Sequence, residues 1–259
     1  MTPPESVPLS LKALHLTTAA RLFPDLLARA HRETWAPEAF AAELLDAELE
    51  ARRQSRVARL AQEAHLPPGK TLASLEHDRL PLRLRRILPG LCAGDFVDRA
   101  DNLLIFGLPG RGKTHLAAAI GHALVEQGRR VHFSSTYALV DRLLRAKRDL
   151  ELERSLRRLD RFAVVILDDI GYVQQSREEM EVLFTLLAER YERRSVIITS
   201  NLVFSEWDRI FKDPLTTAAA IDRLVHHSVI VEFGPDLPSV RAEAAARRQR
   251  DTLTADTPS

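Results

Sequence analysis

The sequence predicts an α/β fold, in which a five-stranded parallel sheet is flanked by helices and preceded by a small all-helical N-terminal domain. Three observations predict this fold class. After residue 100, short runs that are apolar throughout alternate with amphipathic segments, as expected for parallel strands buried on both faces. A glycine-rich turn directly follows the first of these runs. The first third of the chain contains no such run and is rich in Ala, Leu, Glu and Arg.

The N-terminal segment is expected to be helical. Thr34, Pro37 and Glu38 predict a helix start. A broken helical stripe of apolar residues follows, formed by Phe40, Leu44, Leu45, Leu49, Val57 and Leu60. The stretch Leu66-Pro67-Pro68-Gly69 predicts a break. We therefore expect a helical domain over residues 1–66, a second domain over residues 67–250 and a disordered tail over residues 251–259.

The second domain contains the predicted sheet. Strands are expected at residues 102–107, 131–135, 163–169, 195–201 and 228–233. Helices are expected over residues 113–127 and 137–148. A third helix is predicted by apolar residues that share one helical face, namely Met180, Leu183, Phe184, Leu187, Ala188 and Tyr191.

Composition narrows the class of protein. The chain has 259 residues, of which 45% are hydrophobic, and a net charge of +1, so no global field indicates a nucleic-acid or membrane partner. The single cysteine, Cys92, excludes an intrachain disulfide and fits a reducing compartment. The first residues show no signal-peptide pattern, and no apolar run approaches the roughly 18–20 residues of a membrane span. We expect a cytoplasmic protein without a membrane partner.

A phosphate-binding loop is predicted at residues 107–114, GLPGRGKT, between a strand and a helix. Its glycines let backbone N–H groups point inward where a Cβ would clash with phosphate oxygens. Lys113 can reach the β- and γ-phosphates of ATP, and the Thr114 hydroxyl can bind Mg²⁺. A chance match is the alternative, which the flanking strand and helix disfavour. The expected nucleotide-binding residues are Gly107, Leu108, Pro109, Gly110, Arg111, Gly112, Lys113, Thr114 and His115.

Two adjacent acids, Asp168 and Asp169, end the third predicted strand. Alone, such a pair is more typical of a turn or a helix cap. The phosphate-binding loop reverses that preference, because a strand ending in acid is the expected second half of such a site. Asp168 is then expected to hold Mg²⁺, directly or through water. Asp169 is expected to polarise the water that attacks the γ-phosphate.

These motifs resemble a known family. GLPGRGKTHLAAAIGHAL, VVILDDIGY, ERRSVIITSN and AAIDRLVHHSVIVEF occur in this order. The chain resembles the insertion-sequence helper ATPases called IstB, relatives of the helicase loader DnaC within the AAA+ superfamily of P-loop ATPases. The resemblance covers nearly the whole chain, including the helical N-terminal segment. The two phosphate motifs are generic, whereas the IGY, SN and DRLVHH stretches are more specific.

The resemblance implies roles for three further residues. Asn201 matches a sensor amide at the end of the fourth strand, although an Asn there also suits a turn. Arg223 matches the arginine finger that neutralises phosphoryl charge in a neighbouring subunit's site, although a solvated helix arginine is the alternative. Arg241 stands near the second sensor arginine of the family, but the stretch GPDLPSVR departs from the usual Ser-Tyr-Arg-like end.

The acid pair also departs from the pattern of many AAA+ proteins, in which a glutamate follows the aspartate. Asp169 is one methylene shorter than glutamate, so its carboxylate reaches roughly 1.5 Å less far. A general base must lie within about 3 Å of its water. We therefore expect turnover that is slow, or that requires adjustment of the strand when subunits assemble.

Basic residues form two groups. Arg52, Arg53, Arg56 and Arg59 share a predicted helix, and Lys70, Arg79, Arg83, Arg85 and Arg86 follow. The second group is interleaved with acids and comprises Arg142, Arg145, Lys147, Arg148, Arg154, Arg157, Arg158 and Arg161. A solvated surface is the usual explanation of such runs. The resemblance implies sequence-tolerant binding of duplex DNA, for which Arg52, Arg53, Arg56 and Arg59 are the predicted contacts.

The resemblance therefore implies an ATPase that oligomerises with ATP on duplex DNA and delivers target DNA to a transposase, with ATP and Mg²⁺ as cofactors. Hydrolysis is expected to be stimulated by DNA and by assembly. A DnaC-like helicase loader is the main alternative, with the same chemistry and a different client. A small-molecule P-loop kinase lacks support, because no arginine-rich lid or acceptor motif is evident. A scaffold with a relic site is disfavoured by the intact Lys113, Thr114 and Asp168.

Overall fold

The computed structural model describes residues 3–171, 176–202, 206, 207, 221 and 224–234. The chain divides into two compact units, residues 1–59 and 60–259. The division falls inside helix α3 (Pro37–Ala64), which ends just before the predicted Leu-Pro-Pro-Gly break. The predicted domain boundary after residue 66 stays a prediction.

The first unit contains α1 (Pro3–Ala13), α2 (Thr17–Arg32) and the larger part of α3. Its small core is centred on Ala19, Phe23 and Leu44, with the rings of Phe23 and Phe40 edge to face at 5.7 Å. The predicted apolar stripe is wrong at Leu45 and Leu49, whose exposures are 51% and 64%. Successive helical residues are about 100° apart, so Leu45 points away from the face on which Leu44 is buried.

A buried carboxylate caps the N-terminal end of helix α2. The N-cap residue, Leu16, has no capping side chain. Glu48 of α3, only 4% exposed, instead accepts hydrogen bonds from the backbone N–H groups of Thr18 and Ala19 at 2.8 and 3.0 Å. The Ala19 bond, followed by Arg52 and Thr18, lowers the pKa of Glu48 despite its burial. The sequence places an acid from one helix at the positive end of another.

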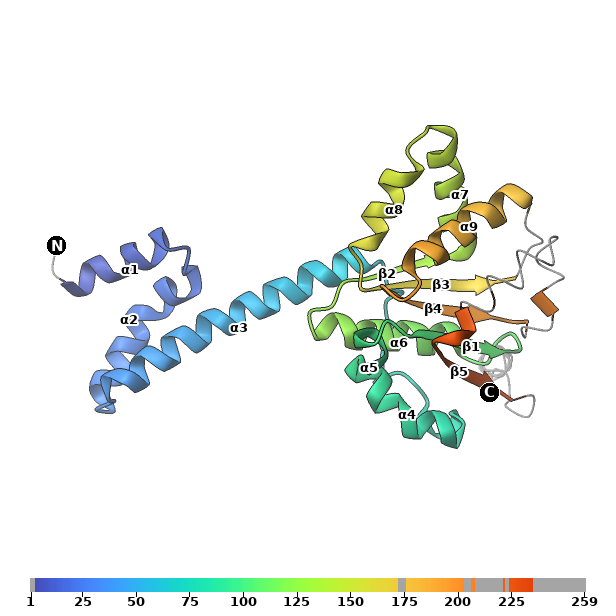
Figure 1. Ribbon diagram of the computed structural model, residues 1–259. Helices are drawn as coiled ribbons and strands as arrows, with labels where there is room; N and C mark the ends of the chain where they lie inside the picture. The colour runs from blue at the N-terminus through green and yellow to red at the C-terminus, as the bar shows by residue number, and fades with distance from the viewer. Residues whose placement is uncertain (1–2, 172–175, 203–205, 208–220, 222–223, 235–259) are drawn as a thin grey trace, which may run out of the picture. The chain divides into compact units, whose positions relative to one another are not determined.

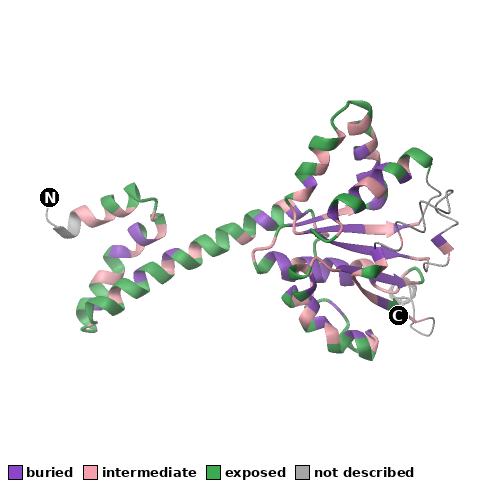
Figure 2. Cartoon of the chain, viewed as in Figure 1, coloured by how far each residue is buried: buried purple, intermediate pink, exposed green. Residues whose placement is uncertain are grey.

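The second unit is built on the predicted five-stranded parallel sheet (Figure 1). Its strands are β1 (Asn102–Gly107), β2 (Val131–Ser135), β3 (Val164–Ile170), β4 (Ser195–Ser200) and β5 (Ser228–Phe233). They lie in the order β2-β3-β4-β1-β5, and every neighbouring pair is parallel. The predicted bounds agree within one residue, and the apolar runs of the three central strands, β3, β4 and β1, reflect burial on both faces (Figure 2).

Helices cover both faces of the sheet. Helix α6 (Lys113–Glu126) packs on one face, with α4 (Leu82–Ala93) outside it, and the short α5 (Asp95–Asp98) follows α4. On the other face, α7 (Thr136–Arg148) and α9 (Arg177–Arg190) cover Leu104, Phe106, Val165, Leu167, Val196 and Ile198. Helix α8 (Leu152–Asp160) packs against α7 and α9 and was not predicted, because it is mostly charged.

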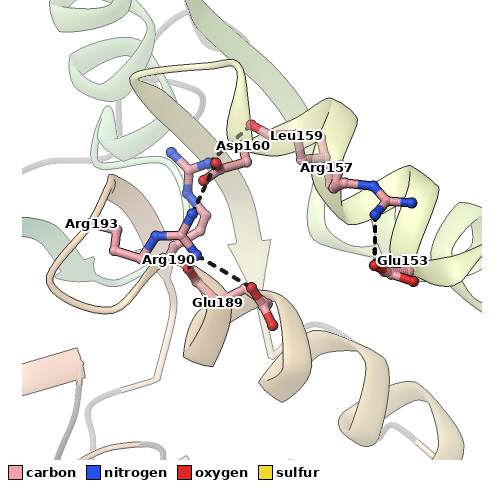
Figure 3. A network of polar contacts seen from close by, with 7 residues as sticks. All are labelled: Glu153, Arg157, Leu159, Asp160, Glu189, Arg190 and Arg193. Atoms are coloured by element: carbon pink, nitrogen blue, oxygen red, sulfur yellow. Dashed lines mark hydrogen bonds and ion pairs between the residues drawn. The ribbon is translucent and has the colours of Figure 1, made fainter.

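The N-terminal edge of the sheet is held by a buried arginine (Figure 3). Arg190, 2% exposed, donates to the backbone carbonyls of Leu159, Phe162, Ala163 and Ser195 at 2.9–3.2 Å. Burial lowers the pKa of Arg190 to about 10, so the guanidinium is still charged at neutral pH. The neighbouring Arg193 reaches the Asp160 carboxylate at 3.2 Å, near the surface.

Among the helices in the described part of the chain, none combines the length and apolar character needed to cross a bilayer.

Candidate nucleotide-binding site

The phosphate-binding loop joins β1 to the start of α6. Gly112 is the N-cap of α6 and adopts a φ of +93°, which favours glycine. Without a side chain it cannot cap the helix, whereas Ser135 and Ser176 cap α7 and α9. The first N–H groups of α6 can therefore take an anionic ligand, as a helix N-terminus does in phosphate sites.

Gly107 is required for a reason other than the predicted one. Its φ is +148°, and a Cβ there would lie 2.8 Å from the Cβ of Phe233 on the paired strand β5. Close approach of the neighbouring strand thus excludes a side chain at this position, independently of any phosphate.

A chain of hydrogen bonds links the loop to the ends of β3 and β4. The buried ammonium of Lys113 donates to the carbonyls of Gly107 and Leu108 at 2.7 and 3.0 Å, and to Asn201 Oδ1 at 2.6 Å. The amide of Asn201 in turn donates to Asp169 Oδ1 at 2.9 Å. Three residues predicted to act on the γ-phosphate, Lys113, Asn201 and Asp169, therefore lie in direct succession.

A β-bulge interrupts β3 at the two acids. Leu167 pairs with Ile198 and Ile170 with Ser200, so β3 advances three residues while β4 advances two. Within the bulge, Asp169 adopts a left-handed φ of +62°, a conformation that aspartate tolerates better than most residues. In a regular strand, adjacent side chains would point to opposite faces.

Thr199 holds the bulge in place. Thr199 is only 1% exposed. Its hydroxyl donates a hydrogen bond to Asp168 Oδ1 at 2.7 Å and accepts one from the Asp169 N–H at 2.8 Å. Because Asn201 follows Thr199 by two residues, both acids meet side chains at the same end of β4. Asp168 and Asp169 are thus both hydrogen-bonded to the end of β4.

These groups surround a pocket of about 230 Å³. Its lining comprises Lys70, Pro109, Gly110, Gly112, Lys113, Thr114, His115, Asp169, Thr199 and Asn201. Sequence reasoning missed two of them. Thr199 was visible as a polar residue within an apolar strand, and Lys70 was assigned to a basic surface group.

His115 fastens the Lys70 segment beside the loop. Its Nε2 lies 3.0 Å from Ser74 Oγ and 3.2 Å from the Thr71 carbonyl. Ser74 Oγ also donates to the Gly69 carbonyl at 2.6 Å and closes a turn around Lys70. His115 therefore connects the start of α6 to a second wall of the pocket.

The residues present fit a magnesium ion. Thr114 lines the pocket, and Asp168 lies beside Thr199, which is another lining residue. One Asp168 oxygen accepts from Thr199; the other accepts no hydrogen bond from the described residues. A hydroxyl and a carboxylate are oxygen ligands of the kind that Mg²⁺ prefers.

The remaining predicted site residues fall into two groups. Arg223 and Arg241 fall outside the described residues. In the first unit, Arg52 pairs with Glu48 at 2.9 Å, and Arg53 with Glu50 at 2.8 Å. The Arg53 contact is the main reason why the pKa of Glu50 is lowered to about 2. Arg52 and Arg53, both predicted to bind DNA, are thus engaged by carboxylates of their own helix.

Comparison with known proteins agrees with this geometry. The sequence family described as IstB-like ATP binding protein matches residues 9–246. An insertion sequence ATP-binding protein from Sinorhizobium fredii is 45% identical over 93% of this chain and 81% of its own length. The ATP-binding protein of insertion sequence IS21 from Pseudomonas aeruginosa is 39% identical over 73% of this chain and 71% of its own.

Solved structures share the fold. AMPPCP-bound DnaA from Aquifex aeolicus aligns with a TM-score of 0.53 and 19% identity, over 72% of this chain and 56% of that one. The DnaC helicase loader aligns with a TM-score of 0.50 and 19% identity, over 68% of this chain and 99% of that one. Both agree with a P-loop AAA+ core.

Proposed function

The chain belongs to the IstB-like ATP-binding protein family, and from this premise we propose that it hydrolyses ATP, assembles on duplex DNA and delivers target DNA to a transposase. The names of its relatives support ATP binding and a place in insertion sequences. The hydrogen-bonded succession Lys113–Asn201–Asp169 is the observation that carries the enzymatic part of this proposal.

Lys113, Asp169 and Asn201 are assigned different roles in hydrolysis. Lys113 exchanges its Asn201 contact for oxygens of the terminal phosphates, so the ammonium neutralises charge that develops there. Asp169 accepts a hydrogen bond from the attacking water and orients it. Asn201 contacts both residues and therefore responds to the presence of the γ-phosphate.

Thr114 and Asp168 would hold Mg²⁺, which supplies charge neutralisation on the phosphate oxygens when bound. Thr199 fixes the Asp168 carboxylate through its 2.7 Å hydrogen bond. A carboxylate held in one rotamer loses less conformational freedom when it binds a ligand.

Assembly is assigned to the junction between subunits. Arg223 is proposed to enter the neighbouring subunit's pocket, and Arg241 is proposed to contact the nucleotide of its own subunit. ATP at the junction then favours the oligomer, and hydrolysis loosens it. Duplex DNA is proposed to contact Arg52, Arg53, Arg56 and Arg59, with DNA phosphates replacing Glu48 and Glu50 as the partners of Arg52 and Arg53.

The first test is Lys113→Ala, with Lys147→Ala as control. Lys147 is a surface lysine paired with Glu181 at 2.8 Å, so its loss removes the same charge away from the pocket. We expect Lys113→Ala to abolish nucleotide binding and ATP-dependent assembly on a duplex, measured by sedimentation. Assembly that persists in Lys113→Ala at the level of Lys147→Ala would refute the nucleotide switch.

The trans-acting role of Arg223 is tested by mixing two inactive variants. Arg223→Ala should bind ATP without turnover, and Asp169→Asn should do the same. Some junctions in a mixed oligomer unite an intact Asp169 with an intact Arg223, so we expect partial recovery of ATPase activity. If the mixture stays as inactive as its components, Arg223 does not act across the junction.

The client is tested by reconstituting strand transfer with an insertion-sequence transposase. We expect ATP-dependent capture of target DNA by that transposase. Stimulation of helicase loading instead, without an effect on strand transfer, would identify the helicase-loader alternative.

A further inference from the structure

A second pocket, of about 390 Å³, lies in the second unit away from the nucleotide-binding residues. Its lining includes Arg130, which directly precedes β2, and Arg161 and Phe162, which precede β3. It therefore opens at the N-terminal edge of the sheet, whereas the nucleotide pocket follows the carboxyl ends of β1, β3 and β4. Strands of five to seven residues separate the two edges by roughly 17–23 Å.

The second pocket is strongly basic. Four arginines line it, namely Arg130, Arg142, Arg158 and Arg161, against a single carboxylate, Glu63. Glu63 lies 3.9 Å from Arg130, which is the outer limit of an ion pair. Four positive charges and one negative charge leave a formal charge of +3 around the cavity.

The arginines of this pocket differ from their neighbours on α7 and α8, which form close ion pairs. On the same two helices, Arg145, Arg154 and Arg157 each reach a carboxylate at 2.7–3.1 Å, and Figure 3 shows the Arg157–Glu153 pair. Arg142, Arg158 and Arg161 have no carboxylate partner among the described residues. The basic group that looked like a uniform solvated surface in the sequence thus contains three cations that converge on one cavity.

Arg142 is positioned by a neutral histidine. One of its N–H groups lies 3.1 Å from Nε2 of His132, which is only 6% exposed. Burial, followed by the charges of Arg142 and His65, lowers the pKa of His132 to about 4; the Glu63 carbonyl acts in the opposite direction. A neutral ring accepts this hydrogen bond without competing for an anion. The Phe162 ring, 5.0 Å from that of His132, gives the cavity an apolar wall.

We propose that this cavity binds a phosphate group. Guanidinium groups from α7, α8 and the start of β2 approach from different directions, which suits the several oxygens of a phosphate better than the two of a carboxylate. The formal charge of +3 is also sufficient to neutralise a dianion. The phosphate comes either from the DNA backbone or from a free phosphorylated compound, and the inference does not depend on the role in transposition.

The test compares charge reversals at neighbouring positions of one segment. Arg158→Glu and Arg161→Glu alter exposed arginines that face the pocket. Arg154→Glu and Arg157→Glu are the matched controls, with the same change of charge at paired arginines. The full chain is first saturated with Mg²⁺ and a nonhydrolysable ATP analogue, so that the nucleotide pocket is filled. Pyrophosphate binding is then measured by calorimetry, and binding of a labelled duplex by fluorescence anisotropy.

We expect both pocket variants to bind pyrophosphate at least tenfold more weakly than both controls, because a charge-assisted contact is replaced by repulsion. If duplex affinity falls in parallel and its salt slope decreases by about one, the phosphate belongs to DNA. If only pyrophosphate binding falls, the ligand is a free phosphorylated compound. Equal binding by pocket variants and controls would overturn the proposal. Nucleotide binding is unaffected in every case, so this result is independent of the Lys113 test.

Discussion

Replacing Thr199 with valine tests the hydroxyl that holds the two acids. Valine has nearly the same shape, so Thr199→Val removes two hydrogen bonds without opening a cavity. The bond to the Asp168 carboxylate is worth about 1.5–3 kcal/mol, and the Asp169 N–H left without an acceptor costs about 1 kcal/mol. We expect the free energy of unfolding to fall by about 2–4 kcal/mol.

The control is Thr199→Ser, which keeps the hydroxyl and loses one methyl group, at a cost of about 1 kcal/mol. Urea unfolding of the full chain, followed by circular dichroism, gives both values. Because the bulge positions Asp168 and Asp169, ATP turnover should fall at least tenfold in Thr199→Val and little in Thr199→Ser. If valine is no more destabilising than serine, the hydroxyl does not hold the bulge, and our account of the acid pair is wrong.

Three further variants test other parts of the second unit. Asp169→Asn should fold with unchanged stability in urea, because asparagine also tolerates a positive φ. Its ATPase activity should nevertheless fall at least a hundredfold, and turnover at the wild-type rate would exclude Asp169 as the general base. Arg190→Met should lower the free energy of unfolding by about 3–5 kcal/mol, since buried carbonyls lose their donor, whereas Arg193→Met, which breaks an exposed pair, should cost under about 1 kcal/mol. His132 is neutral in the folded chain down to about pH 4 but takes up a proton below about pH 6.5 when the chain is unfolded. Acidification from pH 6.5 to pH 4 should therefore lower the free energy of unfolding by up to roughly 3 kcal/mol. His132→Gln should reduce this dependence of stability on pH.

Much of the second unit could be predicted from the sequence because its central strands, β1, β3 and β4, contain continuous apolar runs. Burial on both faces makes such runs recognisable without knowledge of their partners, and all five strands were located within one residue. The loop at residues 107–114 was equally accessible, because its chemistry requires particular residues at fixed spacing. Helix α8 was missed because its charged residues outnumber its apolar ones.

Features that depend on contacts between distant segments could not be predicted. The bulge at Asp169 follows from the register of β3 against β4 and from Thr199, which lies thirty residues further along the chain. Arg157 and Arg158 are adjacent and chemically identical, yet one is paired and the other lines a cavity. No local pattern distinguishes them, because the difference arises from the direction in which each leaves the helix.

The contacts of Lys113 have a consequence for the affinity for nucleotide. Its three N–H donors already have acceptors in Gly107, Leu108 and Asn201. When a triphosphate binds, Lys113 therefore exchanges these protein oxygens for phosphate oxygens. Only the difference in interaction free energy between the two sets of contacts strengthens binding. In the proposed hydrolysis, the amide oxygen of Asn201 accepts the hydrogen bond of Lys113 again once the terminal phosphate departs. The ammonium would then always have an acceptor, which favours product release.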